Sequence, residues 1–173
     1  FNGKCGDNLY WSVDDENTLT IFGTGAMDDY DNIDNKAPWR SLNPAPTSLV
    51  LEEGITHIGN YAFYGCDGFT EVHSSAVIAP TLGTEAFANI NENAILCHPV
   101  SSEPSYEEKG WFEYFRQHVG ADGKCGDNLY WKVSDNTLTI FGTGAMYDYG
   151  NTSNKAPWRS LTTAPTSLVL EDG

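Results

Sequence analysis

The chain is poor in positive charge. Its 173 residues contain 9 Lys and Arg against 24 Asp and Glu, which gives a formal net charge of −15 at pH 7. Nucleic-acid binding needs clustered Lys and Arg, and anionic lipid surfaces attract basic segments. The composition therefore predicts that neither nucleic acid nor an anionic membrane surface is a partner.

Long hydrophobic runs are also missing. The apolar runs are only a few residues long, whereas a membrane-spanning helix needs about 18 apolar residues or more. We therefore expect no membrane insertion. No charged start, apolar stretch and small-residue cleavage site opens the chain, so we expect no signal peptide within it. The abrupt start at Phe1 and stop at Gly173 suggest a mature form or an excised segment.

The familiar motifs of catalysis and metal binding are absent. The sequence has no Cys-x-x-Cys pair, no Gly-x-Ser-x-Gly and no P-loop, and its four histidines are scattered. Carboxylate pairs such as Asp14-Asp15 and Glu52-Glu53 are adjacent, so on a strand they point to opposite faces. Glycoside hydrolysis needs two carboxylates that face each other. We therefore expect no enzyme activity, no catalytic residue and no cofactor.

The strongest metal candidate is the acidic run of Asp28, Asp29, Asp31 and Asp34. Calcium takes several oxygen ligands, but an EF-hand loop needs them at alternate positions with glycine at the sixth. This run does not supply that pattern. We interpret it as a solvated loop and expect no metal site.

What the chain does contain is a long internal repeat. Residues 3–54 match residues 123–173, with about 41 of 51 aligned positions identical and Glu16 without a partner. Residues 1–122 therefore form one full unit, and residues 123–173 a shortened second copy. Repeats of this kind indicate an array of units.

A finer period lies inside the first unit. Ile58-Gly59 precedes Ala62-Phe63, and Leu82-Gly83 precedes Ala86-Phe87, at an offset of 24 residues. A period of 20–29 residues with one short strand per turn is typical of leucine-rich repeats, in which each turn buries its apolar face on the next. The sequence thus predicts a β-rich (α+β) leucine-rich-repeat-like solenoid with β-hairpins and short helices, its turns spanning residues 47–99.

Local signals place the remaining elements. Residues 8–22 read as a β-hairpin around the polar turn 14–17, and Gly23 and Gly25 then break the strand. Short helices are expected from Pro38 to about residue 42 and from Pro104 to about residue 109. A closing aromatic segment, 104–119, contains Trp111, Phe112, Tyr114 and Phe115.

Several of these stretches are distinctive together. They are GKCGDNLYW at 3–11, GTGAM at 23–27, APW at 37–39 and EGITHIGNYAFYGC at 53–66. They resemble the BspA-type leucine-rich-repeat surface proteins of bacteria, and the resemblance covers nearly the whole chain. The sequence departs from that pattern at Ser74-Ser75, where the family has an Ile-Pro-like pair.

The resemblance implies an extracellular or cell-surface protein that is secreted or attached to the cell wall. It implies a binding or adhesion role without catalytic residues. A host or microbial surface protein is then the expected partner. A carbohydrate-binding module of a secreted multidomain enzyme stays open as the alternative, with a glycan as its partner.

Aromatic side chains are the candidate contacts, because flat rings stack on sugar faces. Trp11, Trp39, Trp131 and Trp158 stand in apolar strand or helix contexts, where core packing is expected. Tyr30 and Tyr149 stand in polar loops, so we expect them to be exposed and select them as ligand-contact candidates.

The four cysteines are expected to be buried thiols that act as small apolar side chains. Cys5 and Cys125 are about five turns apart, or on the order of 24 Å at the usual strand spacing. A disulfide needs Cα atoms within roughly 7 Å, so this pairing is excluded if the turns stack.

The strand at 168–170 has no following turn in the second copy. Open edge strands are templates for pairing, and the ends of repeat arrays need polar caps. We therefore expect weak self-association through this end, opposed by the net negative charge.

Overall fold

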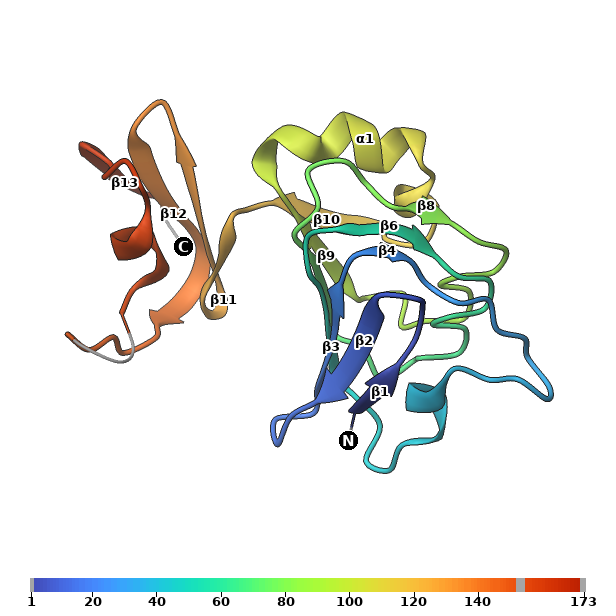
Figure 1. Ribbon diagram of the computed structural model, residues 1–173. Coiled ribbons are helices and arrows are strands. Elements are labelled where there is room, and N and C mark those ends of the chain that lie inside the picture. Colours follow the sequence, from blue (N-terminus) through green and yellow to red (C-terminus); the bar gives the residue numbers. More distant parts are fainter. Residues whose placement is uncertain (1, 152–154, 172–173) are drawn as a thin grey trace. The chain divides into compact units, whose positions relative to one another are not determined.

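The computed structural model describes residues 2–151 and 155–171 (Figure 1). The chain divides into two compact units, Phe1–Val119 and Gly120–Gly173. Both are β-rich, and the helices are few and short. None of the helices in the described ranges has the length and apolar character needed to cross a bilayer.

The first unit is built on a seven-stranded sheet of order β1-β2-β3-β5-β7-β9-β10. The expected hairpin is confirmed, since β2 and β3 pair antiparallel and β1 pairs antiparallel with β2. From β3 through β9 the neighbouring strands pair parallel. The strands are β1 (Asn2–Lys4), β2 (Leu9–Val13), β3 (Thr18–Gly23), β5 (Ser48–Leu51), β7 (Glu71–Ser74), β9 (Ile95–His98) and β10 (Gln117–Gly120).

The register confirms the short period expected from the sequence. Leu49 pairs with Val72, and Val72 pairs with Leu96, so equivalent residues recur every 23 or 24 positions. Each turn also adds a strand to a second, three-stranded parallel sheet of order β4-β6-β8. Its strands are β4 (Gly25–Ala26), β6 (Ile55–Ile58) and β8 (Thr81–Leu82).

Glycines at equivalent places allow these turns to stack closely. A Cβ atom on Gly59 would lie 1.9 Å from the carbonyl oxygen of Asp28. A Cβ atom on Gly83 would lie 2.5 Å from the backbone nitrogen of Asn60. The repeated glycine is therefore required because the backbone of the preceding turn occupies the space of a side chain.

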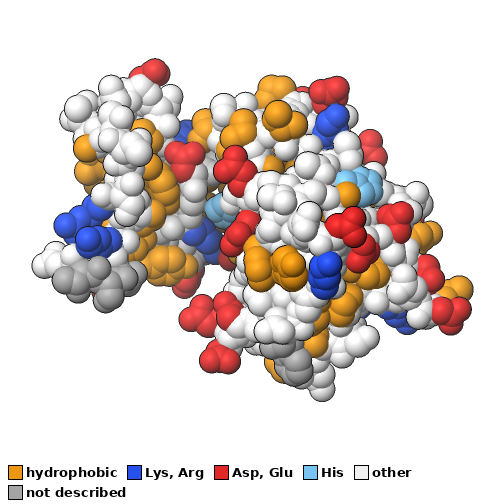
Figure 2. Space-filling model, viewed as in Figure 1, with side chains coloured by type: hydrophobic (Ala, Val, Ile, Leu, Met, Phe, Trp, Pro, Cys, Tyr) orange, Lys and Arg blue, Asp and Glu red, His pale blue; other side chains and the backbone are white. Residues whose placement is uncertain are grey.

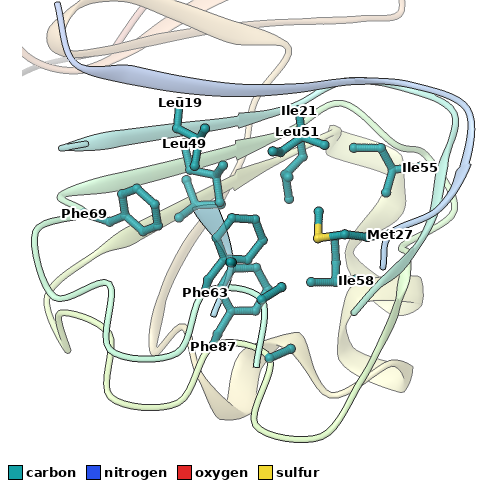
Figure 3. Packing of buried hydrophobic residues seen from close by; sticks show 14 of the residues in the cluster. Leu19, Ile21, Met27, Leu49, Leu51, Ile55, Ile58, Phe63, Phe69 and Phe87 are labelled. Carbon is teal, nitrogen blue, oxygen red and sulfur yellow. The ribbon is translucent and has the colours of Figure 1, made fainter. Parts of the chain in front are cut away.

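The core of the first unit lies between the two sheets (Figure 3). Alternation along β3 and β5 turns Leu19, Ile21, Leu49 and Leu51 inward, and all four are fully buried. The Phe63 ring stacks on the Phe87 ring with centroids 4.9 Å apart. Because these phenylalanines occupy equivalent places in consecutive turns, the stack links one turn to the next.

The expected aromatic closure is present after the last turn. It contains η2 (Val100–Ser102), α1 (Glu103–Glu108) and η3 (Trp111–Glu113). Trp111 is fully buried, lies 5.2 Å from Phe87 between ring centroids, and donates its indole N–H to Pro80 O at 2.9 Å. The Tyr106 hydroxyl donates to Ser74 Oγ at 2.6 Å. Ser74 is therefore bonded to the closing segment.

The second unit repeats the start of the first. Strands β11 (Gly123–Ser134) and β12 (Thr137–Met146) form a hairpin, and β13 (Ser167–Leu170) pairs parallel with β12. The short helix after Pro38 is confirmed as η1 (Pro38–Ser41), with η4 (Pro157–Ser160) as its copy. Both are single 3₁₀ turns, in keeping with the proline at the first position.

All four cysteines are free thiols. Cys5, Cys97 and Cys125 are buried, as expected. The expectation is wrong for Cys66, which is half-buried because it lines a pocket that opens to solvent.

Candidate functional site

The side of the seven-stranded sheet that faces away from the core carries little charge. Neighbouring strands align Ser12, Thr20 and Val50 in one row and Thr18 and Ser48 in another. Two charged side chains lie on it: Lys4 is opposite Tyr10, and Glu71 on β7 accepts a hydrogen bond from Ser48 Oγ at 3.4 Å. In Figure 2 the acidic side chains of the molecule outnumber the basic ones on the face in view. We call this side of β1, β2, β3, β5 and β7 the outer sheet face.

An aromatic pair stands on the outer sheet face. Tyr10 on β2 pairs with Phe22 on β3, and their rings stack with centroids 5.9 Å apart at 27°. Tyr10 is 42% exposed, although it is a large aromatic side chain. The pair borders a hollow of about 540 Å³ that Asn2, Lys4 and Ser12 also line. The arrangement offers ring surface together with a few polar groups, which is the usual make-up of a recognition site.

Strand alternation explains how the sequence places this pair. Leu9 and Trp11 point into the core, so Tyr10 between them points outward. At the end of β3, Gly23 has φ +110°, and a Cβ there would lie 2.1 Å from Asn8 O. The glycine therefore lets the hairpin hold Phe22 opposite Tyr10.

The second unit carries the same pair, but its tyrosine, Tyr130, is only 8% exposed, and the pair has one added contact. Tyr130 and Phe141 lie 5.8 Å apart between ring centroids at 30°. Lys132 replaces Ser12, and its Nζ lies 4.9 Å from the centroid of the Phe141 ring. In this cation–π contact the lysine ammonium lies over the phenylalanine ring, where the first copy has the uncharged serine side chain.

The tyrosines selected from the sequence lie elsewhere. Tyr30 is half-buried and meets Trp39 edge to face, with centroids 5.7 Å apart. Tyr149 meets Trp158 in the same way at 5.7 Å. The expectation of exposed rings is therefore wrong, because each ring packs against the tryptophan of its own copy. Burial accordingly raises the pKa of the Tyr30 hydroxyl. Their role as ligand contacts remains a prediction.

The tryptophans follow the expectation of core packing in three places out of four. Trp11, Trp39 and Trp131 are buried, whereas Trp158 is half-buried. The exception lies in the second unit, where the segment that covers Trp39 in the first unit has no described counterpart.

The acidic run at 28–34 uses its carboxylates to hold its own loop. Asp31 Oδ1 accepts bonds from the backbone N–H groups of Ile33, Asp34 and Asn35 at 2.8–2.9 Å. These bonds lower the pKa of Asp31. Asp29 Oδ1 accepts from the Asn60 N–H at 2.8 Å, which ties the loop to the next turn. Among residues 2–151 and 155–171, no group of three or more His, Cys, Asp and Glu is placed to hold a metal ion.

One serine–histidine contact has the residue types of a catalytic pair. Ser102 Oγ lies 3.3 Å from His98 Nδ1, but it donates its proton to Pro99 O at 2.6 Å. The exposed fractions are 1% for Ser102 and 0% for His98. A nucleophile without access to solvent cannot reach a substrate, so this contact belongs to the packing of the closing segment.

Sequence reasoning missed Tyr10 and Phe22 because both were assigned to the hairpin alone. The signal was present in the alternation of residues 8–13, where a large aromatic residue falls on the polar phase of the strand.

No family model matches the chain, and no curated protein does. Among solved structures, it is similar to a leucine-rich repeat protein from Eubacterium ventriosum ATCC 27560. The identity is 19% and the TM-score 0.47, over 81% of this chain and 48% of that chain. The chain therefore spans about half the length of that protein.

Proposed function

We propose that this chain is a non-catalytic binding or adhesion module of a bacterial surface protein of the BspA type. Its fold is then a leucine-rich-repeat-like solenoid, and its location is extracellular. The observation that carries the proposal is the outer sheet face, which presents the Tyr10–Phe22 pair above rows of hydroxyl side chains.

The composition of this face suits recognition. Protein interfaces are depleted of charge at their centre and enriched in tyrosine and phenylalanine. Here the exposed Tyr10 stands among serine and threonine side chains, with one cation, Lys4, beside it and one carboxylate, Glu71, on the more distant β7, in a chain of net charge −15. Packing between neighbouring strands would by itself explain why two aromatic rings pair. It does not explain why the Tyr10 ring stays 42% exposed.

The repeat supports adhesion in particular. Both hairpins carry the same aromatic pair, but Tyr10 is 42% exposed whereas Tyr130 is 8% exposed, so the first unit presents the ring and the second covers it. An array of full units would present one such site in each unit, and several weak sites on one chain give avidity when the partner also presents several. A host or microbial surface protein fits this pattern.

The second candidate function is carbohydrate recognition within a secreted multidomain enzyme. The hollow beside Tyr10 favours it, because Asn2 and Ser12 offer hydrogen-bonding groups next to a ring face. A sugar ring could stack on the tyrosine while its hydroxyls meet these groups.

The experiment compares wild type with Tyr10→Ala on a panel of purified host and bacterial surface proteins and on a glycan array. We expect saturable binding to a protein that falls about tenfold or more in Tyr10→Ala and is retained in Tyr30→Ala. Circular dichroism confirms that both variants are folded. Saturable glycan binding lost in Tyr10→Ala would favour the second function. Unchanged protein binding in Tyr10→Ala would remove the outer sheet face from the proposal.

A further inference from the structure

A separate pocket lies between the segment around η1 and the following turn of the first unit. Its volume is about 270 Å³. Lys36, Trp39 and Arg40 form one side, and Cys66, Asp67 and Phe69 contribute to the other. Ligand pockets usually measure about 300–1,000 Å³, so this one suits a ligand the size of a single residue.

The pocket concentrates positive charge in an acidic chain. Lys36 and Arg40 are two of only nine Lys and Arg residues. The Lys36 side chain is exposed, and its positive charge contributes to lowering the pKa of Asp31. An exposed ammonium group beside a concave surface is available to an anionic ligand.

Arg40 is already held in place. Its guanidinium donates to Asp31 O at 3.2 Å and to Asn32 Oδ1 at 3.0 Å, and it lies 5.2 Å from the centroid of the Tyr64 ring. These two bonds use two of the five N–H donors of the group. The side chain therefore loses little freedom when a ligand takes a remaining donor, which favours binding.

The other walls are uncharged except at one point. The Trp39 ring is 1% exposed and its indole N–H is committed to Ala62 O at 2.8 Å, so the accessible apolar surface comes from Ala45 and the half-buried Cys66. Burial raises the pKa of the Cys66 thiol to about 12, which keeps it protonated and neutral at pH 7. Asp67 adds a carboxylate that accepts hydrogen bonds and donates none.

We propose that this pocket binds one acidic sugar residue. Lys36 and Arg40 hold the sugar carboxylate, Asp67 accepts a hydrogen bond from a sugar hydroxyl, and the apolar wall meets the ring carbons. A sugar suits the pocket better than an acidic amino-acid side chain, because its hydroxyls supply donors for Asp67 beside the carboxylate.

The second unit supplies a natural control. Lys155, Trp158 and Arg159 repeat the first wall, but the described residues of that unit contain no counterpart of 65–69. Trp158 is half-buried where Trp39 is 1% exposed. The same lysine is therefore present once in a complete pocket and once beside an open surface.

The test titrates D-glucuronate into the full chain, with heat or amide chemical shifts as the readout. D-Glucose and N-acetyl-L-aspartate are the comparison ligands. We expect glucuronate to bind wild type and Lys155→Ala alike, and Lys36→Ala about tenfold or more weakly. We expect both comparison ligands to bind about tenfold or more weakly than glucuronate, and added salt to weaken glucuronate binding. Perturbed amide signals should include 65–69.

Four results would overturn the assignment. Absence of glucuronate binding, or equal binding by wild type and Lys36→Ala, removes the site. If glucose binds as tightly as glucuronate, the carboxylate of the ligand plays no part. If N-acetyl-L-aspartate binds as tightly as glucuronate, the pocket recognises an acidic peptide and not a sugar. The site is independent of the outer sheet face, so Tyr10→Ala should leave glucuronate binding unchanged. Failure here leaves the proposed function intact.

Discussion

The two copies of the repeat have nearly the same sequence and quite different burial. Leu49 and Leu51 in the first unit are 0% exposed, whereas their equivalents Leu168 and Leu170 are 61% and 66% exposed. Met27 is 4% exposed, and its equivalent Met146 is 40% exposed. Yet the parallel pairing of the strands is the same, from Thr18 with Ser48 to Thr137 with Ser167.

The difference shows that the repeated segment specifies its own strand pairing but needs other residues to bury its apolar side chains. The hairpin, the 3₁₀ turn and the parallel strand form in both units, so local sequence determines them. The buried core requires residues 55–115 as well, because these supply Ile55, Ile58, Phe63 and Phe69 against the strands (Figure 3). Strand pairing is therefore encoded within the repeated segment, and burial is encoded by the turns that follow it.

The largest expected effect is at the repeated tryptophan. In the first copy, replacement by alanine removes a buried ring that stacks on Phe63 and bonds to Ala62 O. We expect Trp39→Ala to lower the free energy of unfolding of its unit by about 3–5 kcal/mol. Trp158→Ala, at a half-buried site, should cost about 1 kcal/mol. Denaturant unfolding with exchange of amides from each unit measures both. Similar losses would show that the second unit buries this ring as the first does.

The next effect concerns the exposed leucines of β13. We expect a monomer at micromolar concentration and a weak dimer towards millimolar, because an apolar edge strand offers a surface to a second copy while the charge of −15 opposes contact. Leu170→Glu should weaken the dimer about tenfold or more. Sedimentation over that concentration range is the measurement. A monomer throughout, with the amides of 168–170 protected from exchange, would show that the end covers itself.

A third effect is expected only in the first unit, from pH. His98 is fully buried, its Nε2 has no hydrogen-bond partner among the described residues, and burial lowers its pKa. The ring contacts the rings of Tyr106, Phe112 and His118. The charge of Glu103 acts in the opposite direction and raises the pKa of His98, but burial is the larger influence. The unfolded state therefore binds a proton more readily than the folded state.

The contribution of His98 to the free energy of unfolding is fully present above its pKa in the unfolded state, about 6.5. It is lost as the pH falls from there towards the lowered pKa of the folded state. We expect unfolding of the first unit to show this loss and the second unit, which has no histidine, to lack it. Urea unfolding from pH 8 to 5 measures the effect, and His98→Gln is the variant that should lose it. An equal loss in both units would assign the pH dependence to other groups.

The sequence predicted the repeated features well for a physical reason. Residues that recur at a constant spacing occupy equivalent places in stacked turns. The spacing of the apolar residues therefore predicts that Leu49, Val72 and Leu96 align across neighbouring strands. Proline at the first position and alternation of apolar residues likewise indicate local structure. The exposure of Tyr10 could also have been derived from alternation.

Other features depend on contacts that no local pattern contains. Tyr30 stands in a polar loop, and only the fold shows that it packs on Trp39. The pocket at Lys36 joins two segments about 30 residues apart, so its concave shape appears only when the turns are stacked. The buried Ser74 accepts a hydrogen bond from Tyr106 of the closing segment, 32 residues further along the chain, and no local pattern indicates this pairing.

The smallest predicted effect tests the one place where the two hairpins differ in length. In the first copy, Asp14 Oδ1 accepts bonds from the N–H groups of Glu16 and Thr18, each at 2.9 Å. In the second copy the turn is one residue shorter, and Ser134 stands at the equivalent position. Asp14→Ala should therefore cost about 1 kcal/mol, and Ser134→Ala less than about 0.5 kcal/mol, as for surface sites without such bonds. Denaturant unfolding gives both values. A cost at Ser134 as large as that at Asp14 would mean that the shorter turn depends on its own side chain as much as the longer one does.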